Sequence, residues 1–131
     1  APDIVGGGLE SLEVSMKWRG GYSDCPVLIA VQDGMTSEDV FPYLDKDTGI
    51  AVGGTTEFKK RTLPIWSRLS SRTGCHLHVL RVNTRRRLTA CSVAGAHSVD
   101  GTSASVFSVT APLIRGWVDH LDKQTSLGLW R

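Results

Sequence analysis

The sequence has few of the features that mark several protein classes. Its three cysteines, Cys25, Cys75 and Cys91, are widely spaced, and no CxxC pair occurs. We therefore expect no disulfide scaffold and no zinc site, and we favour reduced thiols in a cytoplasmic protein over a catalytic cysteine. No apolar run approaches the roughly 18 residues of a membrane span, so no membrane partner is expected.

Charge and length give only broad limits. The 15 basic and 13 acidic residues leave a net charge of +2, which by itself implies no nucleic-acid partner. The 131 residues, of which 40% are hydrophobic, suit one domain with a single core. The chain opens at Ala1 without a methionine, and residues 1–5 resemble a strand entered midway. We therefore expect the early part of the domain to be absent from this sequence.

Short apolar runs alternate with segments of helical periodicity, which predicts parallel βα units and an α/β fold. Strands are expected near residues 1–5, 26–32, 50–53, 76–82 and 98–101. Five such units fit either an open doubly wound sheet or the second part of a TIM-type (β/α)8 barrel without its early strands. We favour the barrel, with residues 1–131 as one partial domain. An incomplete barrel would expose strand edges, so a homo-oligomer is a further expectation.

Four threonines lie where helices are expected to begin. A helix over residues 7–19 is predicted first, followed by a short helix capped by Thr36. Thr55 or Thr56 is expected to cap the next stretch, and Thr62 to cap a helix that has Pro64 in its first turn. Asn83-Thr84 is predicted to begin another helix, and a last one starts near residue 110.

In both parallel architectures, ligands bind where the strands end at their carboxyl termini. These ends carry Asp3, Gln32 with Asp33, Gly53-Gly54, Arg81 with Asn83, and Asp100. Together they supply carboxylates, an amide, a guanidinium and glycine backbone, a set suited to a polar planar ligand. The alternative is that strand ends are polar only because loops begin there.

Three short motifs resemble the tRNA-guanine transglycosylase superfamily. They are Val31-Gln32-Asp33-Gly34, Gly49-Ile50-Ala51-Val52-Gly53-Gly54 and Ser98-Val99-Asp100-Gly101-Thr102, in the order and approximate spacing of three strand ends of that family's barrel. Nearly the whole chain is also similar to uncharacterised phage and actinobacterial proteins that we regard as distant relatives of the superfamily. The stretches that carry this second likeness are 53–57, 78–86 and 100–102.

The resemblance implies a base-exchanging glycosyltransferase with Asp100 as its nucleophile. The carboxylate would displace guanine from the sugar, and a 7-deazaguanine base would then displace the carboxylate. Asp3 would accept hydrogen bonds from the guanine ring, Gln32 would donate to its carbonyl, and Gly53 and Gly54 would present backbone groups to its edge. No cofactor is implied.

The likeness departs from the family in two respects. The family's second essential aspartate lies on an earlier strand, and the cysteine-rich zinc site that follows the barrel in the enzymes acting on tRNA has no counterpart here. DNA, tRNA and a small nucleoside therefore all stay open as substrates. Two rival functions stay open as well, namely an N-glycoside hydrolase and a non-catalytic nucleotide- or nucleic-acid-binding module.

Three residue groups have alternative interpretations. A phosphate site is predicted at Arg81, Asn83, Arg85 and Arg86, with Arg87 in the same basic cluster, because basic side chains there oppose the dipole of the helix that begins there. The alternative is a solvated helix face with an ion pair. His76 and His78 point to one face of a strand, but no third ligand is evident, so we expect structural roles and no bound metal. Asp100 itself has the alternative role of capping the Asp-Gly turn that follows it.

Overall fold

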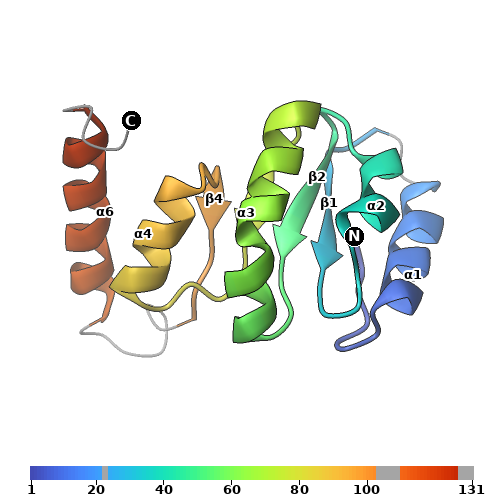
Figure 1. The fold of residues 1–131 in the computed structure, drawn as a ribbon, viewed down its shortest axis with the longest axis horizontal. Coiled ribbons are helices and arrows are strands. Elements are labelled where there is room, and N and C mark those ends of the chain that lie inside the picture. The colour runs from blue at the N-terminus through green and yellow to red at the C-terminus, as the bar shows by residue number, and fades with distance from the viewer. Residues whose placement is uncertain (22–23, 103–109, 127–131) are drawn as a thin grey trace.

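The computed structural model describes residues 1–21, 24–102 and 110–126 (Figure 1). Helices and strands alternate along the chain. In order they are α1 (Leu9–Arg19), β1 (Val27–Val31), α2 (Ser37–Val40), the 3-10 helix η1 (Phe41–Tyr43), β2 (Thr48–Val52), α3 (Thr56–Thr73), β3 (Leu77–Val79), α4 (Arg85–Val93), β4 (Ser98–Val99) and α6 (Thr110–Ser126).

The four strands form one parallel sheet in the order β1-β2-β3-β4, which confirms the predicted α/β class. The order never reverses, so these strands contain no switch point of the kind that defines doubly wound sheets. Successive strands of a βα-barrel follow the same order. Within the described residues the sheet is open, and the fold itself is therefore a parallel βα arrangement rather than a closed barrel.

The predicted strand at residues 1–5 is wrong. Side chains satisfy much of this segment's backbone: Ser11 Oγ accepts from Ile4 N at 2.9 Å, and Ser15 Oγ donates to Pro2 O at 2.7 Å. The Ala1 nitrogen does reach Leu28 O at 2.9 Å, so the segment lies beside the outer edge of β1 without pairing as a strand. Pro2 has no N–H to donate to a ladder, which disfavours regular pairing here.

One face of the sheet packs against the helices and forms the core. The register places Ile29, Ile50 and Leu77 side by side, and Val31, Val52 and Val79 in the next row. All of these side chains are buried in one cluster together with Phe58, Trp66 and Leu69 of α3. Figure 1 shows α3 beside β2 with α1 and α6 at opposite ends of the molecule. The core therefore lies between the sheet and its helices.

The opposite face of the sheet carries small and polar side chains. Ala30, Ala51, His78 and Ser98 are neighbours across the four strands. Gly49 lies two residues before Ala51, and a Cβ there would approach His76 O to 2.5 Å and a Leu28 methyl to 2.8 Å. The neighbouring strands therefore pack closely around Gly49.

Most helix starts follow the predicted caps. The hydroxyls of Thr36, Thr55 and Thr84 each accept from the backbone N–H three residues on, as N-caps do. The cap predicted at Thr62 is wrong, because α3 runs unbroken from Thr56 to Thr73 with Pro64 inside it. Thr62 is buried, and its hydroxyl donates to Phe58 O at 2.7 Å, within the helix.

Candidate active site

A concave pocket of about 290 Å³ lies at the carboxyl edge of the sheet. Five of the residues predicted to bind substrate or phosphate line it: Asp3, Gln32, Gly53, Gly54 and Arg81. They come from the segment before α1 and from the ends of three neighbouring strands. The fold therefore brings together groups that are far apart in the sequence.

The Gln32 side chain binds the backbone of residues 4–6, although it was expected to donate to the carbonyl of a bound base. Its side-chain oxygen accepts from Gly6 N at 2.7 Å, and its side-chain nitrogen donates to Ile4 O at 2.8 Å. The residue is only 5% exposed. Both ends of the amide are thus engaged by the backbone of residues 4–6. Gln32 fastens the segment that carries Asp3 to the end of β1, instead of donating to a ligand carbonyl.

Asp33 organises the turn between β2 and α3. Its carboxylate accepts from Thr55 N at 2.7 Å and from the Thr55 hydroxyl at 2.8 Å, and these bonds lower its pKa below the ordinary value. Gly54 has a φ of +72°, and a Cβ there would lie 2.5 Å from Asp33 Oδ2. The space beside Gly54 is therefore filled by this carboxylate, and not kept open for a base as expected.

Gly53 also takes part in the sheet. Its N–H donates to Val31 O at 2.8 Å, which continues the β1–β2 ladder by one residue. A Cβ at this position would lie 3.2 Å from a Leu80 methyl. The absence of a side chain at Gly53 therefore leaves room for the Leu80 side chain beside the pocket. The Gly53 N–H is already used in the sheet and is not available to a ligand.

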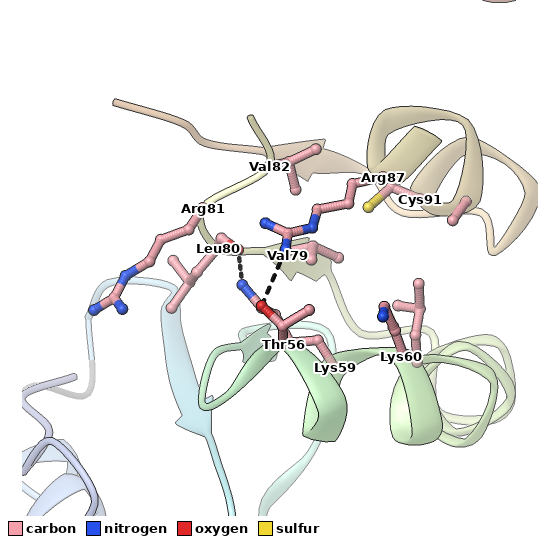
Figure 2. Close-up of a pocket in the computed structure, with 11 residues that line it drawn as sticks. Thr56, Lys59, Lys60, Val79, Leu80, Arg81, Val82, Arg87 and Cys91 are labelled. Atoms are coloured by element: carbon pink, nitrogen blue, oxygen red, sulfur yellow. Dashed lines mark hydrogen bonds between the residues drawn. The ribbon is translucent and has the colours of Figure 1, made fainter. Parts of the chain in front are cut away.

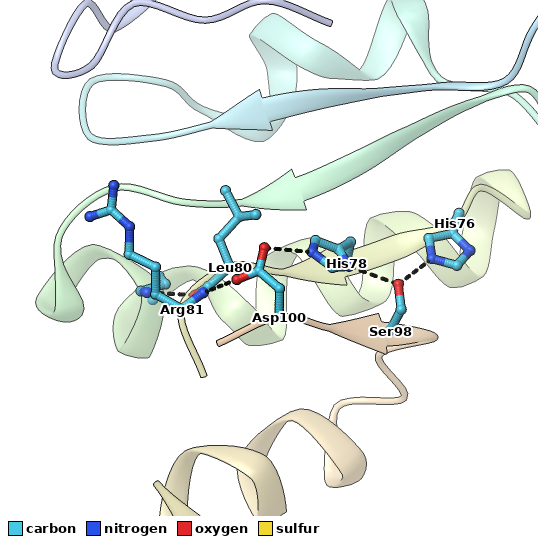
Figure 3. A network of polar contacts seen from close by, with 7 residues as sticks. His76, His78, Leu80, Arg81, Ser98 and Asp100 are labelled. Carbon is cyan, nitrogen blue, oxygen red and sulfur yellow. Dashed lines mark hydrogen bonds and ion pairs between the residues drawn. The ribbon is translucent and has the colours of Figure 1, made fainter. Parts of the chain in front are cut away.

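The Asp100 carboxylate is held by the end of the neighbouring strand. Oδ1 accepts from Arg81 N at 2.7 Å, and Oδ2 lies 3.3 Å from His78 Nε2 (Figure 3). Its backbone continues the ladder, since Asp100 N donates to Val79 O and Val82 N donates to Asp100 O. The side chain remains 51% exposed. These contacts direct the carboxylate toward β3. In the capping alternative it would instead face the turn that follows Asp100.

Gly101 leaves no open space beside Asp100 for a ligand. A Cβ there would lie 2.5 Å from Asn83 Oδ1 and 2.6 Å from Val82 O. The missing side chain instead allows two chain segments to approach closely. Asn83 accordingly lies against the residue that follows Asp100, and it does not line the pocket at the carboxyl edge.

A chain of hydrogen bonds leads from Asp100 along the open face of the sheet. Ser98 Oγ lies 2.8 Å from His78 Nδ1 and 2.7 Å from His76 Nε2 (Figure 3). A carboxylate only accepts, so neutral His78 donates from Nε2 to Asp100 and accepts at Nδ1 from the Ser98 hydroxyl. Ser98 then accepts from His76 Nε2–H. All four groups are therefore satisfied by one direction of donation, from His76 towards Asp100.

The far end of this chain lies among other imidazoles. The His76 and His97 rings are 5.0 Å apart, and His97 Nδ1 accepts from Leu77 N. Partial burial, followed by the charges of His97 and His78, lowers the pKa of His76 below its ordinary value. Neutral His76 is thereby favoured, in agreement with the donation pattern. Within the described ranges, no group of three or more His, Cys, Asp or Glu side chains has the arrangement to hold a metal ion.

A second, smaller pocket of about 60 Å³ lies between α3 and α4. Lys59 and Arg87 line it together with Arg81, which also lines the larger pocket. Lys59 Nζ donates to Leu80 O at 2.8 Å, and an Arg87 guanidinium nitrogen donates to the Thr56 hydroxyl at 3.0 Å (Figure 2). The predicted phosphate residues Arg85 and Arg86 are exposed and line neither pocket.

Arg81 has an unusual backbone conformation. Its φ of +57° makes it the one non-glycine residue with positive φ in the described part of the chain. That conformation costs an L-residue roughly 1–2 kcal/mol. It places the Arg81 N–H on Asp100 while the side chain extends over the pocket at the carboxyl edge. Such strain commonly accumulates at functional sites.

Cys91 is buried at the wall of the smaller pocket. Burial raises its pKa to about 11, although the Lys59 charge acts in the opposite direction. A thiol with this pKa stays protonated near neutral pH and is a poor nucleophile. Asp100 is thus the better candidate nucleophile.

Comparisons with known proteins found no match to this chain. No family model matches the chain, and neither a curated protein nor a solved structure matches it. In the described residues, no helix has both the length and the apolar character needed to cross a bilayer.

Proposed function

We propose that the protein is a base-exchanging glycosyltransferase that replaces guanine in DNA or tRNA by a 7-deazaguanine, with Asp100 as the nucleophile. The observation that carries this proposal is the half-exposed Asp100 carboxylate, which is oriented by His78 and by the backbone N–H of Arg81, a residue that lines the pocket at the carboxyl edge. The unreversed strand order supports a partial (β/α)8 barrel as the scaffold.

In the first step, an Asp100 oxygen attacks the anomeric carbon. A carbon–oxygen bond forms, the bond from that carbon to the base nitrogen breaks, and its electron pair leaves with guanine. The leaving base takes up one proton. In the second step the incoming base gives up one proton, attacks the same carbon and releases the carboxylate. Protons therefore balance over the cycle, provided that a nearby group holds one between the two steps.

His78 is the group best placed to hold that proton. It lies beside Asp100, and Ser98 and His76 connect it to the exposed end of the open face. The imidazolium form gives a proton to the leaving base, and the neutral form accepts one from the incoming base. Asp3 provides the exposed carboxylate for the purine N–H groups, while Gln32 fixes the segment that carries it.

Isotope-labelled guanine tests the exchange directly. We expect the purified protein to incorporate the label into guanine-containing DNA or tRNA, and acid-quenched samples to contain a sugar adduct on the peptide with Asp100. Release of base without incorporation would instead identify an N-glycoside hydrolase. Binding without either release or an adduct would contradict the proposal and favour a non-catalytic module.

Replacing His78 by glutamine is expected to slow exchange by about 10²- to 10⁴-fold, the usual size of general acid–base catalysis. Glutamine still donates to Asp100 and accepts from Ser98, but it cannot carry a proton. Any part of the pH dependence of kcat that comes from a proton carried at position 78 should be absent from His78→Gln. The measurement is kcat between about pH 5 and 9.

The matched control is His120→Gln, at an exposed position of α6. Its rate and pH profile should equal those of the unmodified protein. If His78→Gln shows the same profile as this control, His78 does not carry the proton.

A further inference from the structure

Three cationic side chains from three different segments line one small pocket near the proposed nucleophile. Lys59 comes from α3, Arg81 follows β3, and Arg87 comes from α4. All three line the small pocket between α3 and α4, and Lys59 and Arg81 also line the pocket at the carboxyl edge (Figure 2). We call these three residues the cationic triad.

Within the described residues, no carboxylate is in ion-pair contact with a side chain of the triad. Lys60 is a fourth cation that lines the small pocket, but it is paired with Glu57 at 3.1 Å. Lys59 and Arg87 instead bind neutral oxygens, those of Leu80 and Thr56. Three positive charges therefore share a partly buried region with little compensation.

This arrangement is unfavourable in the absence of an anion. Burial, then the charge of Arg87 and then that of Arg81, lowers the pKa of the Lys59 ammonium, and Asp100 offsets these effects only in part. An anion between the three side chains would remove the repulsion and restore charge-assisted hydrogen bonds. The first turns of α3 and α4 flank the pocket through Thr56 and Arg87, and helix N-termini also favour anions.

Arg81 connects this region to the proposed chemistry. Its backbone N–H holds Asp100 Oδ1, and its side chain lies along both pockets (Figure 3). An anion on the triad would thus be attached close to the carbon that Asp100 attacks. In a nucleotide unit, the group with that charge and position is the phosphate next to the sugar.

We infer that Lys59, Arg81 and Arg87 bind a phosphate group, and that this phosphate belongs to the polynucleotide strand next to the exchanged nucleoside. The inference rests on the proposed function for the identity of the nucleoside, but not for the binding of phosphate. It favours a strand of DNA or RNA over a free nucleoside as substrate. It also moves the phosphate site from Arg85 and Arg86 to a position between two helices.

Binding measurements with variants of the triad test this inference. The probes are inorganic phosphate and a short guanine-containing single-stranded oligonucleotide. We expect Lys59→Met and Arg87→Gln each to weaken oligonucleotide binding about tenfold and to lower the slope of log affinity against log salt by about one. Lys59→Arg should restore most of the affinity. Lys46→Met and Arg68→Gln make the same charge changes at exposed positions outside both pockets, and should bind as the unmodified protein does.

The two probes separate the sources of phosphate. Weakened oligonucleotide binding supports a phosphodiester, and weakened binding of inorganic phosphate alone supports a small phosphorylated ligand at the same residues. Equal affinities of the triad variants and their controls for both probes would overturn the inference, provided that circular dichroism shows them folded. The proposed function would survive that result if labelled guanine still enters DNA or tRNA, and it would fail separately if phosphate binds without exchange.

Discussion

Replacing Asp100 by asparagine is expected to lower the rate of base exchange by at least about a thousand-fold. Asparagine has nearly the same shape, and its oxygen still accepts from Arg81 N–H, so the end of β4 should stay in place. It lacks the negative charge that attacks the sugar, and no ester forms. Base binding at the pocket should survive, because the groups that line it are unchanged. Labelled-guanine incorporation and equilibrium binding of guanine measure the two effects.

Asp47→Asn is the matched control for this variant. Asp47 is an exposed carboxylate immediately before β2, at the opposite edge of the sheet from Asp100. It should exchange base at the unmodified rate. An Asp100→Asn protein that exchanges base as fast as this control would show that Asp100 has a structural role, and the transglycosylase proposal would lose its main support.

Replacing Trp66 by alanine is expected to lower the free energy of unfolding by about 3–5 kcal/mol. Trp66 is 1% exposed in the core between α3 and the sheet, with its ring 6.5 Å from that of Phe58. Alanine would leave a cavity that helix and strand cannot close without losing other contacts. Chemical denaturation followed by circular dichroism measures the change.

Trp66→Phe is the matched control, and it should cost far less. The indole Nε1 is buried and finds no hydrogen-bond acceptor in the described ranges of the chain. A buried donor without an acceptor costs roughly 1–3 kcal/mol, so removing it offsets part of the lost ring volume. A Trp66→Phe protein as unstable as Trp66→Ala would show that the indole N–H has a partner that stabilises the core.

Features that depend on neighbours in the sequence were predictable here. The apolar run at residues 27–31 gives a strand, and threonines at positions 36, 55 and 84 begin helices, because a cap needs only the next three residues. Segment 1–5 has strand-like residues, yet whether it pairs depends on side chains of α1 and on Gln32, which follows β1. Nothing within the segment reveals those partners.

In the candidate site, too, features set by sequence neighbours were predictable and features set by distant contacts were not. Strand ends located Arg81 and Asp100, because parallel strands all end at one edge. Asp3 lines the pocket although the strand predicted to carry it does not form. The contacts of His78 and Lys59 were not predicted, since their partners Ser98, Asp100 and Leu80 lie about 20 residues away in the sequence. The register of β3 with β4 decides the first contact, and the packing of α3 on β3 decides the second. A histidine within one strand, together with a serine two residues before the carboxylate of the next strand, is the one sequence signal that was available.

The backbone of Arg81 has a consequence for how this site can change. A glycine at position 81 would adopt the φ of +57° without the roughly 1–2 kcal/mol cost and would keep the N–H that holds Asp100. It would lose only the guanidinium. Stability and ligand affinity therefore oppose each other at this one position, and selection for a more stable fold alone would favour glycine. If the Arg81 side chain binds phosphate as proposed, related chains that bind the same ligand are expected to have arginine at position 81, and those that do not are expected to tolerate glycine there.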